Sequence, residues 1–235
     1  MSETDYSCDF MKPLDLVCEA DPRNAGTYPD FMGGGQRKID YFHEKISNFK
    51  LIDEIPVDVR IKFETAKNLY IYSWFVYRFF NIAEQQAFTC LEFGLREFFK
   101  DEIPNEYKNR YGDIYLGKLL KYTVDIEYIK NDDFEIHRHK TWLSAKQRYE
   151  SEKLMEMHEK GLGEIILDES EVQIKPEDHS DYLAILLRNL PYLRNSYAHG
   201  SSMLHNNVLS TFQLVSEILN STYQRKLNRE LNGSG

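Results

Sequence analysis

The sequence has few cysteines and no apolar run long enough for a transmembrane helix. Its three cysteines, Cys8, Cys18 and Cys90, are odd in number and lack C-x-x-C spacing, so we expect no disulfide framework and a reducing compartment. The apolar stretch 69–80 contains Arg78 and is much shorter than the ~20 residues of a membrane span. The first residues carry acids and no apolar core, so no signal peptide is expected. These absences predict a cytoplasmic protein with no membrane partner.

An excess of positive charge is also missing. Lys and Arg total 29 against 38 Asp and Glu, a formal net charge of -9. A general nucleic-acid binder usually presents a basic surface, which the chain as a whole does not predict. Residues 181–230 differ from the rest of the chain, because this region contains five basic residues and only three acidic ones. Any cationic surface is therefore expected in this region.

Proline is sparse, and the apolar residues repeat with a helical period. From Val59 to Lys100 there is no proline and one glycine, which predicts one long helix or two helices with a break near Asn81. In this stretch Phe88, Leu91, Leu95 and Phe98 are spaced three or four residues apart, which places them on one face of a helix. Glu92 and Arg96 stand four apart on the flank of that face and are expected to pair.

The remaining pattern predicts an all-α bundle with long antiparallel helices. Further helices are expected at 37–49, 114–124, 142–160, 181–199 and 204–231. Helix 142–160 should turn Trp142, Ala145 and Tyr149 inward, and the seam of the last helix should consist of Leu204, Val208, Phe212, Val215 and Leu219. Pro191 should kink or restart its helix, Gly200 should end it, and Gly161 should cap helix 142–160. The segment 126–140 is expected to be irregular. The acidic connector 164–180 has room for a short strand or hairpin.

Three units are expected along the chain. Residues 1–36, rich in Pro, Gly, Asp and Asn, should form a flexible or surface-wrapping N-terminal arm. Residues 37–232 should form a single all-α domain. The closing residues 233–235, Gly-Ser-Gly, are expected to be a linker remnant.

The stretch PYLRNSYAHGSS, residues 191–202, carries the residues best suited to chemistry. Asn195 and His199 are four apart, so they share a helix face, and Asn195 can fix the imidazole tautomer. Arg194 and His199 are five apart, about 140° around an ideal helix. Arg binds phosphoryl oxygens and His transfers protons near neutral pH. The spacing predicts half a site, completed by a second copy across a two-fold interface.

LRNSYAHG resembles the signature of the HEPN superfamily (higher eukaryotes and prokaryotes nucleotide-binding), in which an Arg and a later His lie on a late helix of an α-bundle. AEQQAFTCLEFGLREFF is similar to the first-helix pattern of bacterial members, and EILNSTY to the tail of their last helix. The resemblance implies a HEPN-like helical bundle. Its activity would be that of a metal-independent endoribonuclease acting as a homodimer, in a toxin–antitoxin or anti-phage defence system.

The resemblance also implies residue roles. His199 would be the general acid and base, Arg194 would stabilise charge on the scissile phosphate, and Asn195 would orient His199 or contact phosphate. RNA would be the substrate, because its own 2′-OH is the nucleophile. Tyr197 and His205 are candidates to support these residues. The homodimer would form across the helix 181–199, with Tyr182 and Tyr192 at its surface. An antitoxin or regulatory protein would be a further partner.

One subgroup of the superfamily carries a tyrosine two residues after the His, and that tyrosine is modified. Ser201 stands there in this chain, so inactivation by tyrosine modification is not expected.

Plainer interpretations accompany each feature. Arg194, Asn195 and His199 could only decorate a helix end, and the chain could be a non-catalytic helical module that binds a partner protein or a nucleotide. His137 and His139 lie close in sequence to acidic residues but match no closed metal site, so a solvated polar loop is expected there. No metal and no cofactor are expected.

Overall fold

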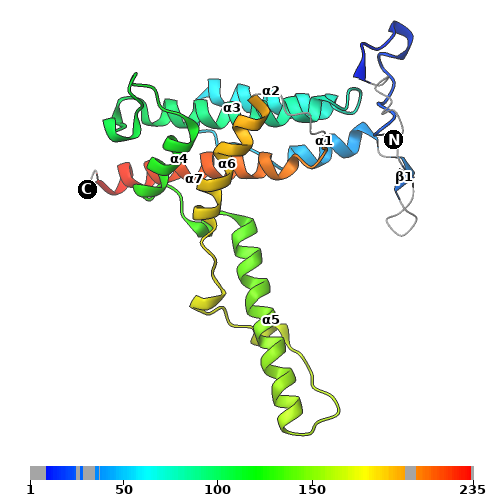
Figure 1. Cartoon of the computed structure of the whole chain (residues 1–235), viewed down its shortest axis with the longest axis vertical. Helices are drawn as coiled ribbons and strands as arrows, with labels where there is room; N and C mark the ends of the chain where they lie inside the picture. The colour runs from blue at the N-terminus through cyan, green and yellow to red at the C-terminus, as the bar shows by residue number, and fades with distance from the viewer. Residues whose placement is uncertain (1–8, 25–26, 29–34, 37, 199–204, 234–235) are drawn as a thin grey trace.

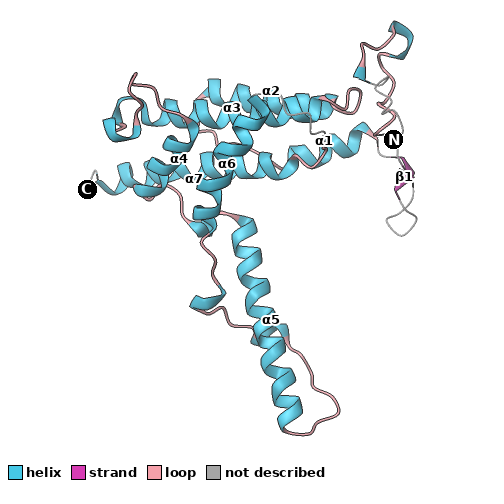
Figure 2. Cartoon of the chain, in the orientation of Figure 1, coloured by secondary structure: helices cyan, strands magenta, loops and turns pink. Residues whose placement is uncertain are grey.

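The computed structural model describes residues 9–24, 27–28, 35–36, 38–198 and 205–233. Within them the chain forms seven α-helices and one two-residue antiparallel ladder, which confirms an all-α fold (Figures 1 and 2). The helices are α1 Ile39–Ser47, α2 Val57–Tyr72, α3 Phe79–Phe99, α4 Leu116–Asp125, α5 Glu135–Glu159, α6 Tyr182–Ala198 and α7 Leu209–Gly233. The ladder pairs β1 Thr27–Tyr28 with β2 Gly35–Gln36.

The core of the body is formed by α2, α3 and α7. The predicted apolar face of α3 is buried, as are four of the five residues predicted for the seam of the last helix: Val208, Phe212, Val215 and Leu219. The fifth, Leu204, lies outside the described residues. Gly94 of α3 permits the close approach of α7, because a Cβ at this position would lie 2.7 Å from Leu219 Cδ2.

The break between α2 and α3 lies at residues 73–78, earlier than the predicted position near Asn81. Its backbone groups are paired by the N-terminal segment 9–24. The Asn24 side chain donates to the carbonyls of Ser73 and Trp74, and Asp21 accepts from the Tyr77 amide at 3.0 Å. Since helix ends leave polar groups unpaired, these distant partners let the chain turn here.

Acid is expected to release the segment 9–24 from this turn. Burial of Asp21 opposes its ionisation, but hydrogen bonds from the Arg23 side chain and from the amides of Tyr77 and Arg23 outweigh burial and hold its pKa below the usual 3.8. A carboxylate with a lowered pKa stabilises the fold fully above its ordinary pKa. That contribution is lost as the pH falls through the lowered pKa. The segment should therefore stay bound at neutral pH and detach below 3.8.

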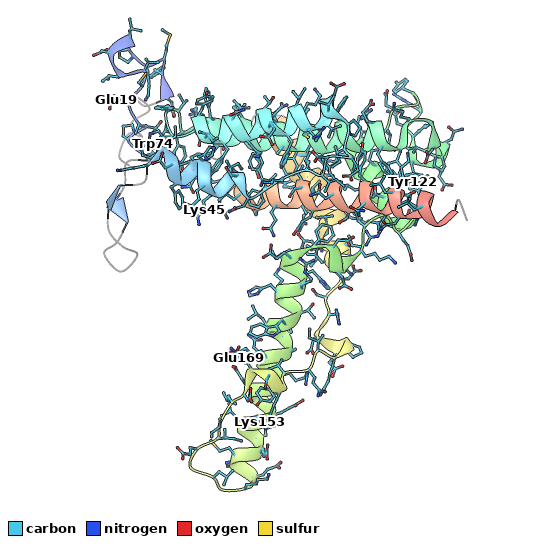
Figure 3. The ribbon with its side chains drawn as sticks, turned by 180° about the vertical axis from the view of Figure 1, so that it is seen from behind. Glu19, Lys45, Trp74, Tyr122, Lys153 and Glu169 are labelled. Atoms are coloured by element: carbon cyan, nitrogen blue, oxygen red, sulfur yellow. The ribbon has the colours of Figure 1, made fainter. Side chains whose placement is uncertain are left out.

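Trp74, labelled in Figure 3, can report this release. Its carbonyl oxygen accepts from the Asp21 amide at 2.9 Å. The chain has two tryptophans, so Trp142→Phe leaves Trp74 as the only one. Its emission should shift to the red below pH 3.8 while the body remains helical. Asp21→Asn should show the shifted emission already at neutral pH. Unchanged emission down to the pH at which helicity is lost would contradict the prediction.

Helix α5 projects from the body as a long arm, and residues 161–181 return beside it (Figure 1). The prediction of an irregular segment up to 140 is wrong, because α5 begins at Glu135. Phe134 is buried there, and the Glu135 amide donates to Glu217 on α7 at 3.0 Å. Gly161 ends the helix with φ of 62°, as predicted.

The returning connector contains no strand among its described residues, so the expected strand or hairpin is wrong. It forms two short 3-10 turns, Glu169–Glu171 and Pro176–Asp178. Charged pairs fasten it to α5: Lys146 with Glu169, Lys153 with Glu171 at 3.0 Å, and Arg148 with Asp178 at 2.9 Å. Figure 3 places Lys153 and Glu169 on this arm. In the described part of the chain, no helix has the length and apolarity needed to cross a bilayer.

Candidate functional site

The predicted motif begins in the last turns of α6, which crosses the body and contacts α3 and α4 (Figure 1). The helix continues through Pro191 as one element, so the predicted restart did not occur. Gly117 of α4 accommodates the proline ring, because a Cβ on this glycine would lie 3.0 Å from Pro191 Cγ. α6 is therefore packed against the body just before the motif.

The structure describes part of the predicted catalytic set. Asn195 and Tyr197 are described as helical backbone, and His199 lies outside the described residues. The Arg194 side chain is 37% exposed, and its Nη2 donates to Glu92 Oε2 of α3 at 3.0 Å. Arg194 thus turns toward α3 and is fixed there by a carboxylate.

Glu92 is shared by two arginines. The predicted pair with Arg96 is confirmed, with Arg96 Nη2 donating to Glu92 Oε1 at 2.7 Å. Glu92 itself is only 8% exposed, whereas the Arg96 side chain is 40% exposed. These three groups, two guanidinium groups and one carboxylate, together carry a formal charge of plus one. Because both arginines reach solvent, this cluster can bind an anion such as a phosphate.

A second buried carboxylate, Glu84, lies eight residues earlier on α3 and is 4% exposed. Thr211 Oγ1 donates to Glu84 Oε1 at 2.6 Å, and His205 Nε2 lies 3.4 Å from Glu84 Oε2. Eight residues span about 12 Å of helix axis. His205 and Arg194 therefore contact the same helix about two turns apart.

The burial of these two carboxylates on α3 is not among the features predicted from the sequence. Glu84 and Glu92 are spaced i and i+8, with Phe88 between them at i+4, so all three follow one stripe of α3. Phe88 is buried, and acidic residues are almost never buried unless they are paired. Two acidic residues on the stripe of α3 that faces the core therefore indicate that partners from another element pair with them. This pattern can be read from the sequence.

The prediction of a solvated polar loop around His137 is wrong. His137 lies in the first turn of α5 and is 1% exposed, while His139 is exposed as expected. Ligand atoms of Asp132, His137 and His179 all lie within 4.8 Å of one another. This group can hold a metal ion. Asp132 and His137 lie where the arm begins, and His179 lies where the returning connector ends.

Cys90 is a buried structural thiol, in agreement with its position on the apolar pattern of α3. Its Sγ donates to the Val59 carbonyl at 3.3 Å, and burial raises its pKa to about 12. A thiol with so high a pKa is a poor nucleophile at neutral pH. Nucleophilic cysteine chemistry is therefore not supported at Cys90.

The described part of the site is thus a cluster of Arg194 and Arg96 on the Glu92 carboxylate, at the base of the predicted motif, with a composition suited to an anion. Anion binding requires arginine side chains that solvent can reach, and these two are 40% and 37% exposed. Comparison of the chain with models of protein families, with curated proteins and with solved structures found no match.

Proposed function

We propose that the protein is a metal-independent endoribonuclease of the HEPN type that acts as a homodimer. The observation that carries the proposal is the fixed position of Arg194. Its guanidinium is held by the buried carboxylate of Glu92, and the side chain as a whole remains 37% exposed. An arginine that is both oriented and accessible is suited to a phosphoryl oxygen, because its planar fork binds two oxygens at once.

The proposed reaction uses the 2′-OH of RNA as the nucleophile. His199 removes its proton and returns a proton to the leaving 5′ oxygen, and Arg194 stabilises the negative charge that develops on the phosphoryl oxygens. Asn195 orients His199 or contacts the phosphate. DNA lacks the 2′-OH, so RNA is the substrate class.

The exposed side of α6 supports the proposed dimer. Ile185, Arg188 and Tyr192 are exposed at helical spacing, and Tyr192 is 74% exposed. Asn195 follows Tyr192 by three positions and precedes His199 by four, so helical periodicity expects them on the same side. Tyr182, also expected at the dimer surface, is half-buried and packs on Phe134 within its own chain.

Acidic residues introduced on this surface are expected to separate the dimer. The double variant Ile185→Asp with Tyr192→Asp places four acids at a two-fold interface, where like charges repel. Light scattering should give a mass of 27.8 kDa for the variant and twice that for the unmodified chain. Leu154→Asp, on the exposed side of the arm, is the control and should leave the dimer intact. A variant that retains the double mass would place the interface elsewhere.

RNA cleavage in EDTA tests the proposed activity. Purified protein should cleave single-stranded RNA in EDTA and leave a 2′,3′-cyclic phosphate, while an oligonucleotide of the same sequence in DNA should stay intact. Cleavage that requires added Mg²⁺, or equal cleavage of DNA, would contradict the proposed mechanism. The products are separated by denaturing electrophoresis and identified by mass spectrometry.

A second function is favoured by the same salt bridge. Glu92 partly neutralises Arg194, and the chain carries a net charge of -9, which opposes the approach of RNA. On this interpretation the chain is a non-catalytic helical module that binds a partner protein or a nucleotide. Light scattering separates the two functions, because a strict monomer has only half of the proposed catalytic site.

The biological setting follows from the proposed activity alone. A dimeric ribonuclease of this kind fits a toxin or an anti-phage defence effector, held inactive by an antitoxin or regulatory protein until triggered. Such a partner would need to cover the exposed side of α6 or the Arg194 cluster.

A further inference from the structure

The base of the arm holds a group of side chains unrelated to the proposed ribonuclease site. We propose that Asp132, His137 and His179 bind a divalent cation of the zinc class there. Asp132 lies in the 3-10 turn Asn131–Asp133 just before α5, and His179 lies at the end of the returning connector. Their ligand atoms and those of His137 already lie within 4.8 Å of one another.

The tautomer of His137 is set by its surroundings. Its Nε2 lies 3.1 Å from the Ser180 carbonyl oxygen, which can only accept, so Nε2 carries the hydrogen. The neutral ring then has its lone pair on Nδ1. Metal-binding imidazoles commonly donate their other N–H to a carbonyl in this way, which orients the ring and raises its basicity.

The Nδ1 atom of His137 is buried and has no hydrogen-bond partner among the described residues. Asp132 Oδ1 lies 3.5 Å away, so a lone pair and a carboxylate oxygen face each other. Two acceptors at this distance repel unless a proton or a metal ion lies between them, and the nearby His179 nitrogen offers a metal ion a third ligand. His137 is 1% exposed and the Asp132 side chain 79% exposed, so the position between them is closed on the His137 side and open to solvent on the Asp132 side.

His179 supplies the third ligand and is free to adjust. Its ring centroid lies 5.8 Å from that of His137, with the two planes tilted by 32°. Zinc ligands at ~2.0–2.1 Å in a tetrahedron lie about 3.3 Å from each other. The ligand atoms here lie within 4.8 Å of one another, so some must approach by about 1 Å to bind zinc. The exposed side chains of Asp132 and His179 can make this movement, while the buried His137 stays in place. A fourth position remains for water.

The neighbours of Asp132 are anchored, so the site has a rigid base. Asn131 Oδ1 accepts from the Leu183 amide of α6 at 2.8 Å. Asp133 binds Arg225 of α7 through contacts of 2.5 and 2.7 Å. These contacts fix both sides of Asp132 against the body. Two imidazoles and one carboxylate favour a zinc-like ion over Mg²⁺ or Ca²⁺, which prefer oxygen ligands.

A bound ion would close the whole arm into a loop, from Asp132 before α5 to His179 before α6. Tying the ends of a long loop removes much of its freedom in the unfolded chain. The ion would hold the connector against the start of α5 and so fix the first turn of α6. This inference does not rest on the proposed ribonuclease function, because none of its ligands belongs to that site.

Zinc titration of the full chain, freed of any affinity tag, tests the site. Apoprotein prepared by dialysis against a chelator is titrated with Zn²⁺ in competition with a chromophoric chelator. One equivalent should bind per chain. His179→Ala should lower the affinity by at least ~10-fold, the smallest loss typical even of indirect partners of a metal. Because His179 is exposed, this variant should fold normally.

His139→Ala is the matched control, because His139 is exposed and lies two residues from His137. It should bind zinc as the unmodified chain does. Hydrogen exchange supplies a second measurement: Zn²⁺ should slow exchange in 132–138 and 178–183 in the unmodified chain but not in His179→Ala. The proposal is overturned by the absence of stoichiometric zinc binding, or by equal affinity in His179→Ala. These results leave RNA cleavage by Arg194 and His199 unaffected, so the two proposals fail separately.

Discussion

Replacing Arg194 and His199 together by alanine is expected to lower the rate of RNA cleavage by at least ~10³-fold. A positioned acid–base group contributes ~10²–10⁴-fold, and one donor to developing negative charge contributes ~10²–10³-fold. The two losses should not multiply fully, because both residues act on one phosphate. The measurement is the single-turnover rate on a labelled RNA in EDTA.

The Arg194→Ala variant should remain folded, which makes its activity interpretable. Glu92 keeps Arg96 at 2.7 Å when Arg194 is removed, so no buried carboxylate is left unpaired. Arg194→Lys should recover only part of the rate, because lysine keeps the charge and loses the planar fork. His158→Ala and Arg110→Ala alter exposed residues away from the motif and should match the unmodified chain. Undiminished cleavage by the double alanine variant would remove this site assignment.

Phe212→Ala should lower the free energy of unfolding by ~3–5 kcal/mol, the largest stability loss expected from one substitution. Phe212 is fully buried on α7, and its ring contacts those of Phe63 and Tyr70 of α2 at centroid distances of 5.8 and 6.0 Å. Deleting the ring removes apolar burial and leaves a cavity where α2 and α7 meet.

Urea denaturation followed by circular dichroism measures this loss. Phe212→Leu, which keeps most of the volume, should cost less than about half as much. Leu154→Ala on the exposed side of α5 should change the free energy of unfolding by less than ~0.5 kcal/mol. A loss below ~1 kcal/mol for Phe212→Ala would contradict the packing of α7 on α2.

The parts of the fold that could be predicted are those with a long apolar period. The faces of α3 and α7 repeat at three and four residues over several turns, and both are buried as predicted. Ala145 and Tyr149, predicted to face inward from the charged helix α5, are also buried, and Trp142 is half-buried. Burial of this kind depends on local spacing, which the sequence carries directly.

The parts that could not be predicted depend on residues far away in the chain. The turn at 73–78 is stabilised by Asp21 and Asn24, and the start of α5 by Glu217. The sequence near these two boundaries does not indicate such distant partners. The break between α2 and α3 and the start of α5 were therefore predicted at the wrong residues. Hydrogen bonds that join distant segments satisfy backbone groups as well as a local cap does.

The candidate sites show the same division. The spacing of Arg194, Asn195 and His199 could be read from the sequence, whereas the carboxylate that holds Arg194 comes from α3. The group of Asp132, His137 and His179 joins two segments separated by the whole arm. Such groups depend on how the connector folds back along α5, which short-range periodicity does not encode.

Mixing two inactive variants tests the central claim, that residues 194–199 form half of a site completed by a second copy. Arg194→Ala and His199→Ala are each purified, combined at equal concentration, and left to exchange subunits. A mixed dimer keeps one intact Arg194 and one intact His199, and a composite cleft brings them together. Cleavage by the mixture should therefore rise well above that of either variant alone. A mixture as inactive as its parts, beside an active unmodified chain, would contradict the composite site.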